Sequence, residues 1–238
     1  SSLAVALPRD ETLLIDVSSG TILLRQLRAA GIGLAQVRHV IISHRHFDHA
    51  GGLAPLLVAL VPVAGAEVTI HAAPPTLKAL HDLLALTIPG VEDWLGPRLR
   101  WRELRGGRPV AIGDLAVTPF EVQPGIDCIG VRLAQGGRSA VFTADTRPCP
   151  NVATWAADAD LLIHEVYGHD RDAEATHYFG HSTATDAGAT ARDAAARRLL
   201  LTHLRSSSFA DPAALAAEAA DAFGGAVGVV SDLEVVEF

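Results

Sequence analysis

The chain has 238 residues, with 19 lysines and arginines against 27 aspartates and glutamates, which gives a formal net charge of −8. At roughly 100–200 residues per domain, this length suits one large domain or two small ones. Because 49% of the residues are hydrophobic, the composition excludes a disordered chain. The negative charge also argues against a broad basic face that would hold nucleic acid.

Composition also bears on where the chain works. Its two cysteines, Cys128 and Cys149, are too few for a disulfide framework and fit a reducing cytoplasm. No apolar run approaches the ~20 residues of a membrane-spanning helix, and no secretory signal is recognisable. The sequence contains no methionine, so its true N-terminus is unknown. We therefore expect a cytoplasmic protein without a membrane anchor.

In the first third of the chain, short apolar runs alternate with helical patterns. The expected strands are Thr12–Val17, Val37–Ser43 and Val68–His71, and the expected helices are Gly20–Ala30, Leu53–Val61 and Thr76–Leu86. The middle contains short runs separated by glycine-rich turns, which predicts an antiparallel meander. Its strands are Leu99–Leu104, Pro109–Ile112, Leu115–Val122, Ile129–Ala134 and Ser139–Thr143.

Helices return in the last third, between and before further strands. The expected helices are Asn151–Ala157, Thr183–Ala196 and Asp211–Phe223, and the expected strands are Leu161–His164, Leu199–Thr202, Val227–Val230 and Leu233–Val236. The strands are almost continuously apolar, as expected when helices cover the sheets. No linker or repeat interrupts the pattern, so we expect one α/β domain over residues 1–238.

The most informative segment follows the expected strand Val37–Ser43. It places His44, His46, Asp48 and His49 within six residues. Imidazole and carboxylate groups are the ligands of zinc, iron and manganese. A solvated polar loop with chance histidines is the alternative, but the order His-x-His-x-Asp-His favours a metal site.

This segment resembles the HxHxDH signature of the metallo-β-lactamase superfamily, and the resemblance continues along the chain. Asp16 matches the aspartate that supports the signature, Asp145 the carboxylate that bridges two metals, and His203 the last metal histidine. Leu161–Glu165 and Gly180–Thr183 resemble motifs of the ribonuclease Z-like phosphodiesterase branch. The resemblance implies a four-layer αββα sandwich with metals at the edge of its two sheets.

One position departs from that family. Where ribonuclease Z-like members carry a further metal histidine, this chain has Pro124, whose side chain offers no ligand atom. The first site would keep His44, His46 and Asp145, and the second would keep Asp48, His49, Asp145 and His203. Three protein ligands are the usual number for catalytic zinc, so we expect two metal ions, with the first site the weaker. Zinc is expected, with iron or manganese as alternatives, and His71 is a possible substitute ligand but more often a surface histidine.

The expected chemistry is hydrolysis. Two metal ions polarise a substrate oxygen and hold a hydroxide for attack, and Asp48 can orient that hydroxide. His181 is the candidate proton donor to the leaving group, oriented by Glu165, although a helix-cap histidine and a polar strand end are the alternatives. The helix that begins just after His181 favours a nearby anion, which suits a phosphate ester.

The resemblance also bears on the substrate. Members that process tRNA carry a long arm between the position of Pro124 and the bridging aspartate, and here that interval is 21 residues. We therefore expect a small phosphodiester or cyclic phosphate rather than tRNA, and family resemblance makes a homodimer plausible. The alternatives are a mononuclear hydrolase of an ester, lactone or sulfate, and an inactive metal-binding scaffold.

Overall fold

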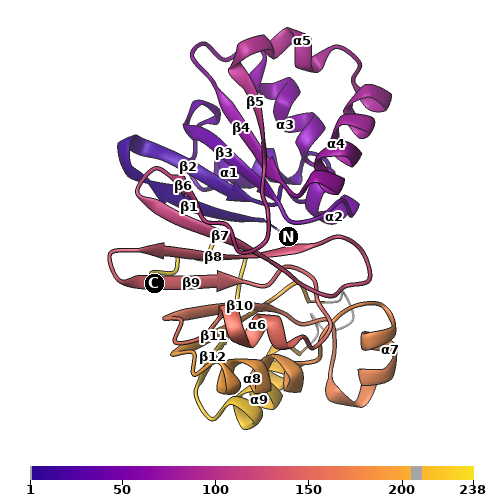
Figure 1. The fold of residues 1–238 in the computed structure, drawn as a ribbon, viewed down its shortest axis with the longest axis vertical. Coiled ribbons are helices and arrows are strands. Elements are labelled where there is room, and N and C mark those ends of the chain that lie inside the picture. Colours follow the sequence, from indigo (N-terminus) through magenta and orange to yellow (C-terminus); the bar gives the residue numbers. More distant parts are fainter. Residues whose placement is uncertain (1, 205–210) are drawn as a thin grey trace. The chain divides into compact units, whose positions relative to one another are not determined.

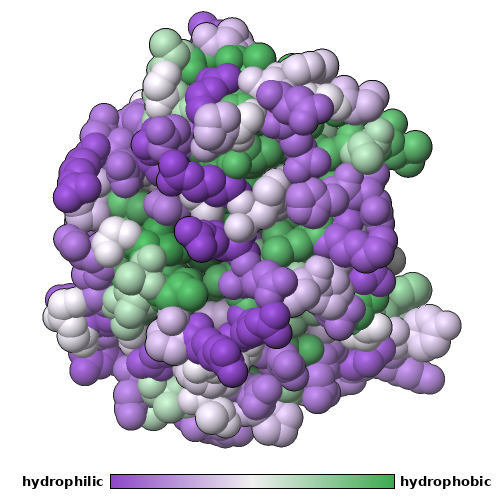
Figure 2. All heavy atoms as spheres, turned by 45° about the horizontal axis from the view of Figure 1, so that its top comes forward, coloured by the Kyte–Doolittle hydropathy of each residue, from purple (hydrophilic) through white to green (hydrophobic). Residues whose placement is uncertain are grey.

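The computed structural model describes residues 2–204 and 211–238. It divides into two compact units, Ser1–Arg105 with Ile112–Asp114, and Gly106–Ala111 with Leu115–Phe238. Each unit contains one sheet and its own helices, and each is described separately (Figure 1). On the face drawn in Figure 2 most side chains are hydrophilic, in line with the net charge of −8. Among the described residues, no helix is long and apolar enough to span a membrane.

The first unit is built on a five-stranded sheet of order β1-β2-β3-β4-β5. Its strands are β1 (Leu3–Leu7), β2 (Glu11–Ile15), β3 (Val37–Ile42), β4 (Val68–Ala72) and β5 (Leu99–Glu103). The pair β1 and β2 is antiparallel, whereas the later neighbours are parallel and therefore need crossover connections. The helices in those crossovers are α1 (Ile22–Ala29), α2 (Phe47–Ala50), α3 (Leu53–Leu60), α4 (Pro74–Thr87) and α5 (Val91–Leu95).

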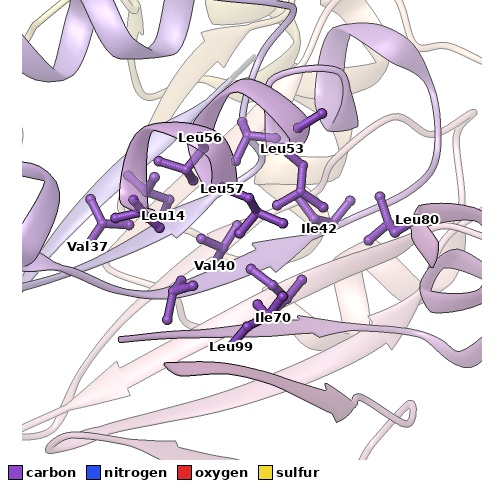
Figure 3. Packing of buried hydrophobic residues seen from close by; sticks show 14 of the residues in the cluster. Leu14, Val37, Val40, Ile42, Leu53, Leu56, Leu57, Ile70, Leu80 and Leu99 are labelled. Atoms are coloured by element: carbon purple, nitrogen blue, oxygen red, sulfur yellow. The ribbon is translucent and has the colours of Figure 1, made fainter. Parts of the chain in front are cut away.

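Helix α3 provides much of the core of this unit. Its buried leucines recur at the spacing of one helix face, and they lie over alternate residues of β3 and β4 (Figure 3). Leu57 is completely buried there, and burying a leucine side chain contributes about 1.5–3 kcal/mol. Gly52 precedes α3, and a Cβ atom at that position would lie 1.9 Å from the carbonyl oxygen of Val17. Only glycine lets the chain enter α3 this close to the end of β2.

The second unit has a seven-stranded sheet of order β12-β11-β10-β9-β8-β7-β6. Its strands are β6 (Val110–Ile112), β7 (Leu115–Glu121), β8 (Ile129–Gln135), β9 (Arg138–Phe142), β10 (Leu161–Glu165), β11 (Arg198–Thr202) and β12 (Ala226–Val229). Strands β7, β8 and β9 are antiparallel, and β9 to β12 are parallel. The helices are α6 (Pro150–Trp155), α7 (Ala173–Tyr178), α8 (Ala184–Asp193) and α9 (Pro212–Phe223). A Cβ atom at Gly188 would lie 2.2 Å from the carbonyl oxygen of Ala219, so α8 and α9 pack backbone to backbone.

Two expected strands differ from the structure. Residues 99–103 do not join the antiparallel meander, because β5 pairs in parallel with β4 in the first sheet. Residues 233–236 form a turn and irregular backbone, with Leu233 and Val235 largely exposed. Strand β1 and helices α2, α5 and α7 were not expected. The prediction of a single domain stays a prediction.

Candidate functional site

In the first unit, a buried carboxylate organises the histidine loop that follows β3. Asp16 accepts hydrogen bonds from the Ser43 backbone N–H (2.7 Å), the Ser43 hydroxyl (2.8 Å) and Nδ1 of His49 (2.7 Å). All three residues are at most 1% exposed. A carboxylate can be buried at this position because three donors replace its hydration. The expected support of the signature by Asp16 is therefore confirmed.

These contacts fix the protonation pattern of two histidines. The single hydroxyl proton of Ser43 points to Asp16, so its oxygen accepts from Nδ1 of His44, 3.0 Å away. His49 likewise donates its Nδ1 proton to Asp16. In their neutral forms both rings therefore carry the lone pair on Nε2, which is the form in which histidine binds a metal.

The rings of the loop converge. Nε2 of His44 lies 3.0 Å from Nδ1 of His46, and Nε2 of His49 lies 3.2 Å from Oδ2 of Asp48. The rings of His44 and His49 have centroids 4.1 Å apart. His44 and His49 are buried, whereas His46 and Asp48 are exposed. Short helix α2 carries Asp48 and His49, so the loop brings all four expected ligands of this segment into one cluster.

In the second unit, three neighbouring parallel strands end in polar residues. Asp145 follows β9, Glu165 ends β10 and His203 follows β11. Nε2 of His203 lies 3.4 Å from Oδ1 of Asp145, and Nδ1 of His181 lies 4.0 Å from Oδ2 of the same carboxylate. Asp145, His181 and His203 each offer one ligand atom, and these atoms lie within 4.8 Å of one another. The carboxyl ends of parallel strands are where such folds bind ligands.

Glu165 holds the candidate proton donor. Its Oε1 accepts hydrogen bonds from Nδ1 of His181 (3.0 Å) and from the backbone N–H groups of Thr146 (3.0 Å) and Ser182 (3.1 Å). Burial, and then the neighbouring charge of Asp145, raise the pKa of the Glu165 carboxyl well above its ordinary value. Its second oxygen, Oε2, is buried without a hydrogen-bond partner among the described residues. The contact expected between Glu165 and His181 is present.

The backbone fixes His181 from both sides. Helix α7 ends in a Schellman motif, in which Gly180 N–H bonds the His177 carbonyl (3.1 Å) and His181 N–H bonds that of Thr176 (3.1 Å). Gly180 has the left-handed φ of +90° that this motif needs. Helix α8 begins just beyond, capped by Thr183, as the sequence predicted.

Comparison with known proteins identifies the family. The model of the Beta-lactamase superfamily domain matches residues 11–204. The chain belongs to the metallo-β-lactamase superfamily. Ribonuclease Z of Myxococcus xanthus is 30% identical over 288 aligned positions, which cover 100% of this chain and 91% of that protein.

Solved structures show the same fold. The metallo-β-lactamase fold protein YhfI of Bacillus subtilis has a TM-score of 0.79 at 24% identity, covering 94% of this chain and 86% of that one. The short form of human tRNase Z has a TM-score of 0.75 at 20% identity, covering 100% and 92%. The protein is thus a metal-dependent hydrolase with the metallo-β-lactamase fold, in the ribonuclease Z-like branch.

Divalent metal ions, which this superfamily implies, fit the residues of this chain. In the first unit, His44 and His49 leave Nε2 available as a ligand atom when neutral, and the same loop carries the carboxylate of Asp48. In the second unit, an aspartate and two histidines gather their ligand atoms. Imidazole and carboxylate groups in this proportion suit zinc, iron or manganese.

His71 is not the surface histidine that the sequence suggested. It is buried, and its Nε2 lies 3.2 Å from Nδ1 of His39 on the neighbouring strand. Burial lowers the pKa of His71 to about 4. The contact with His39 accounts for this ring, and among the described residues His71 belongs to no group of side chains that could hold a metal ion.

Sequence reasoning missed two residues that contact His181 or the helix leading to it. Tyr167 stacks on its ring, and Arg147 donates to the carbonyl oxygens of His177 and Tyr178 in α7. Neither belongs to a motif with characteristic spacing. The stacking of Tyr167 places the start of the connection over residues 167–180 against His181.

Proposed function

We propose that this protein hydrolyses a small phosphodiester or cyclic phosphate. The observation that carries the proposal is the pair of the buried Glu165 and the partly buried His181 beside Asp145 and His203, at the carboxyl ends of parallel strands. Such a pair supplies a proton donor next to the proposed metal ligands, as the cleavage of a phosphate ester with an alcohol leaving group requires.

The proposed metal ligands are those that the family resemblance implies: His44, His46, Asp48, His49, Asp145 and His203. Their grouping into one centre rests on that resemblance and not on a distance between the units. When bound, two divalent ions, zinc in the first instance, would polarise the phosphoryl oxygen and activate water. Pro124 offers no ligand atom, so the site of His44 and His46 is proposed to be the weaker one. Asp48, exposed at the end of its loop, is proposed to orient the attacking water.

His181 is proposed to protonate the leaving oxygen from Nε2. Glu165 accepts a hydrogen bond from Nδ1, which sets the ring orientation and stabilises the imidazolium form. Three N–H donors converge on the same carboxylate oxygen, and they favour its ionised form. Positive charge at Asp145 would lower the pKa of Glu165, because it would remove the repulsion that raises that pKa.

The short interval between Pro124 and Asp145 supports a small substrate. Residues 124–145 contain the hairpin of β8 and β9 and their connecting loops, so this interval has no long arm. The alignment with the Myxococcus ribonuclease Z is 288 positions long against 238 residues here, so that relative has at least 50 residues without a counterpart in this chain. An RNA 3′ end is the second candidate substrate, favoured by the 30% identity to ribonuclease Z over the whole chain.

The test begins with metal content per chain, followed by turnover of a p-nitrophenyl phosphodiester, a 2′,3′-cyclic nucleotide and a precursor tRNA. We expect close to two metal ions and turnover of the small esters. His181→Ala should lower turnover of the 2′,3′-cyclic nucleotide, whose leaving alcohol needs a proton, about 10²–10⁴-fold, the usual contribution of a general acid. Turnover of the p-nitrophenyl ester, whose leaving group departs as a stable anion, should fall much less. His81→Ala is the matched control, because His81 lies on α4 and pairs with Glu92.

Other outcomes contradict the proposal. Turnover of the precursor tRNA alone would establish the second candidate. Activity on an aryl ester or lactone that is indifferent to His181 would indicate altered chemistry at one metal. A protein that binds metal but turns over none of these compounds would be a scaffold.

A further inference from the structure

A second ring lies flat against His181. The ring centroids of Tyr167 and His181 are 4.3 Å apart and their planes differ by 8°. His203 continues the group, with its centroid 5.3 Å from that of His181. Offset-stacked rings at this separation attract each other beyond their shared apolar area.

The backbone holds both rings in place. Tyr167 lies two residues beyond the end of β10, and its N–H donates to the carbonyl oxygen of Ser182 (3.0 Å). Gly168 forms a parallel bridge with Thr183, and its carbonyl accepts from Ala184 N–H (3.1 Å). The segment that carries Tyr167 is thus paired with the segment that directly follows His181.

Glu165 alone does not fix the imidazole. Its hydrogen bond holds Nδ1 at one point, and the ring can still tilt about the line of that bond. A flat contact against one ring face removes the tilt. Together the two contacts determine where Nε2 points.

We propose that Tyr167 is a positioning residue for His181, which keeps the plane of the imidazole aligned for proton transfer. The inference rests on the proposed function. In that step the phosphorus–oxygen bond to the leaving group breaks, and its electron pair stays on the leaving oxygen. That oxygen takes the Nε2 proton, while the oxygen of the attacking water bonds to phosphorus and its released proton restores His181 through solvent.

The inference is tested with two esters that differ in the need for a proton. An alcohol leaving group, as in a dinucleotide, needs protonation, whereas p-nitrophenolate leaves as a stable anion. Tyr167→Leu should lower kcat for the dinucleotide about tenfold with little change in KM, and kcat for the p-nitrophenyl ester less than about twofold. Tyr167→Phe keeps the ring and should restore kcat for both esters, which a role of the hydroxyl would not allow.

Tyr178→Leu is the matched control, because Tyr178 lies between Tyr167 and His181 in the sequence and its exposed ring contacts Phe179 edge to face. It should leave both rates unchanged. If Tyr167→Leu does not fold, Tyr167→Met offers a second non-aromatic replacement. Equal losses of kcat on both esters would overturn the inference.

A second readout separates this inference from the proposed function. Crystal structures of the metal-loaded wild type, Tyr167→Leu and Tyr167→Phe would show the orientation of the His181 ring directly. We expect one orientation with Tyr or Phe and a tilted or multiple orientation with Leu. An unchanged ring in Tyr167→Leu would overturn the positioning role. A wild type that cleaves neither ester would instead refute the proposed function.

Discussion

Asp16→Asn should weaken metal binding although Asp16 is not itself a proposed ligand. The carboxylate accepts three hydrogen bonds, and an amide of the same shape has one accepting oxygen and one donating nitrogen. If the amide oxygen takes the Ser43 N–H, the amide nitrogen faces Nδ1 of His49 and the Ser43 hydroxyl. His49 must then carry its proton on Nε2. The Ser43 hydroxyl accepts from the amide and turns its own proton toward Nδ1 of His44, so His44 also carries its proton on Nε2. Both Nε2 lone pairs are lost.

The magnitude follows from the alternatives open to the amide. To bind metal, the variant has two choices. The histidines can return to their original protonation, and the Nδ1 proton of His49 and the Ser43 hydroxyl proton then face the amide N–H₂. Alternatively the amide can turn over, and its N–H₂ then faces the Ser43 N–H. Either choice leaves buried donors without an acceptor, which costs about 1–3 kcal/mol. At about 1.4 kcal/mol per factor of ten, metal binding weakens about fivefold to 150-fold. The metal-free variant keeps a full set of neutral hydrogen bonds, so we expect it to fold with a loss of only about 1–2 kcal/mol.

The assay is competition for zinc against a chromophoric chelator, with the folded fraction measured in the same samples. Asp82→Asn is the matched control, because Asp82 is an exposed aspartate of the same unit, paired with Lys78. Nitrogen-15 NMR of the histidine side chains in metal-free protein reports which ring nitrogen carries the proton. Unchanged zinc affinity, or an Nδ1 proton retained on His49 in the variant, would refute the reasoning.

Three further predictions concern packing and pH. Gly180→Ala places a Cβ 2.1 Å from the Pro124 carbonyl oxygen, and it should lower both kcat and the melting temperature. Gly137→Ala is the control, because Gly137 is also at positive φ but has open space around it, and it should not lower both. Leu57→Ala should cost about 2–5 kcal/mol in urea unfolding, and a loss below about 1 kcal/mol would contradict the packing of α3. The pKa of His71 lies at about 4 in the folded protein against 6.5 unfolded, so the unfolded state binds more protons between these values. Stability should therefore fall as the pH drops from about 6.5 to 4, and His71→Asn should make that fall shallower; an equal slope would show that His71 does not contribute.

The sequence predicted most helices and strands because apolar periodicity and turn residues within each segment indicate its type. The runs Val37–Ser43 and Leu53–Val61 correspond closely to β3 and α3. Sheet membership is not local, and this explains the wrong placement of Leu99–Leu104, whose parallel partner β4 lies before a long helix. Leu233–Val236 has a strand-like composition, but the chain there turns at the surface.

Within the site, the sequence spacing predicted the cluster of metal-ligating side chains that lies in one contiguous motif. The order of His44, His46, Asp48 and His49 is enough to define a cluster, because the loop is too short to separate these side chains. The stacking of Tyr167 on His181 depends on how the 13 intervening residues return to the sheet edge, and no spacing rule contains that path. The protonation of His44 likewise depends on the distant Asp16.

Backbone conformation adds a last link between fold and chemistry. Among the described residues other than glycine, those that are both buried and at positive φ are Asp16 (59°) and Ala144 (53°). The first directly follows β2, and the second precedes Asp145 in the loop after β9. A left-handed conformation costs an ordinary residue about 1–3 kcal/mol and persists only where its surroundings determine it. At Asp16 those surroundings are the three hydrogen bonds of its carboxylate, so the contacts that set the histidine protonation also hold the strained turn. Because the amide of Asp16→Asn can still make hydrogen bonds at this turn, the substitution should weaken metal binding more than it lowers the stability of the fold.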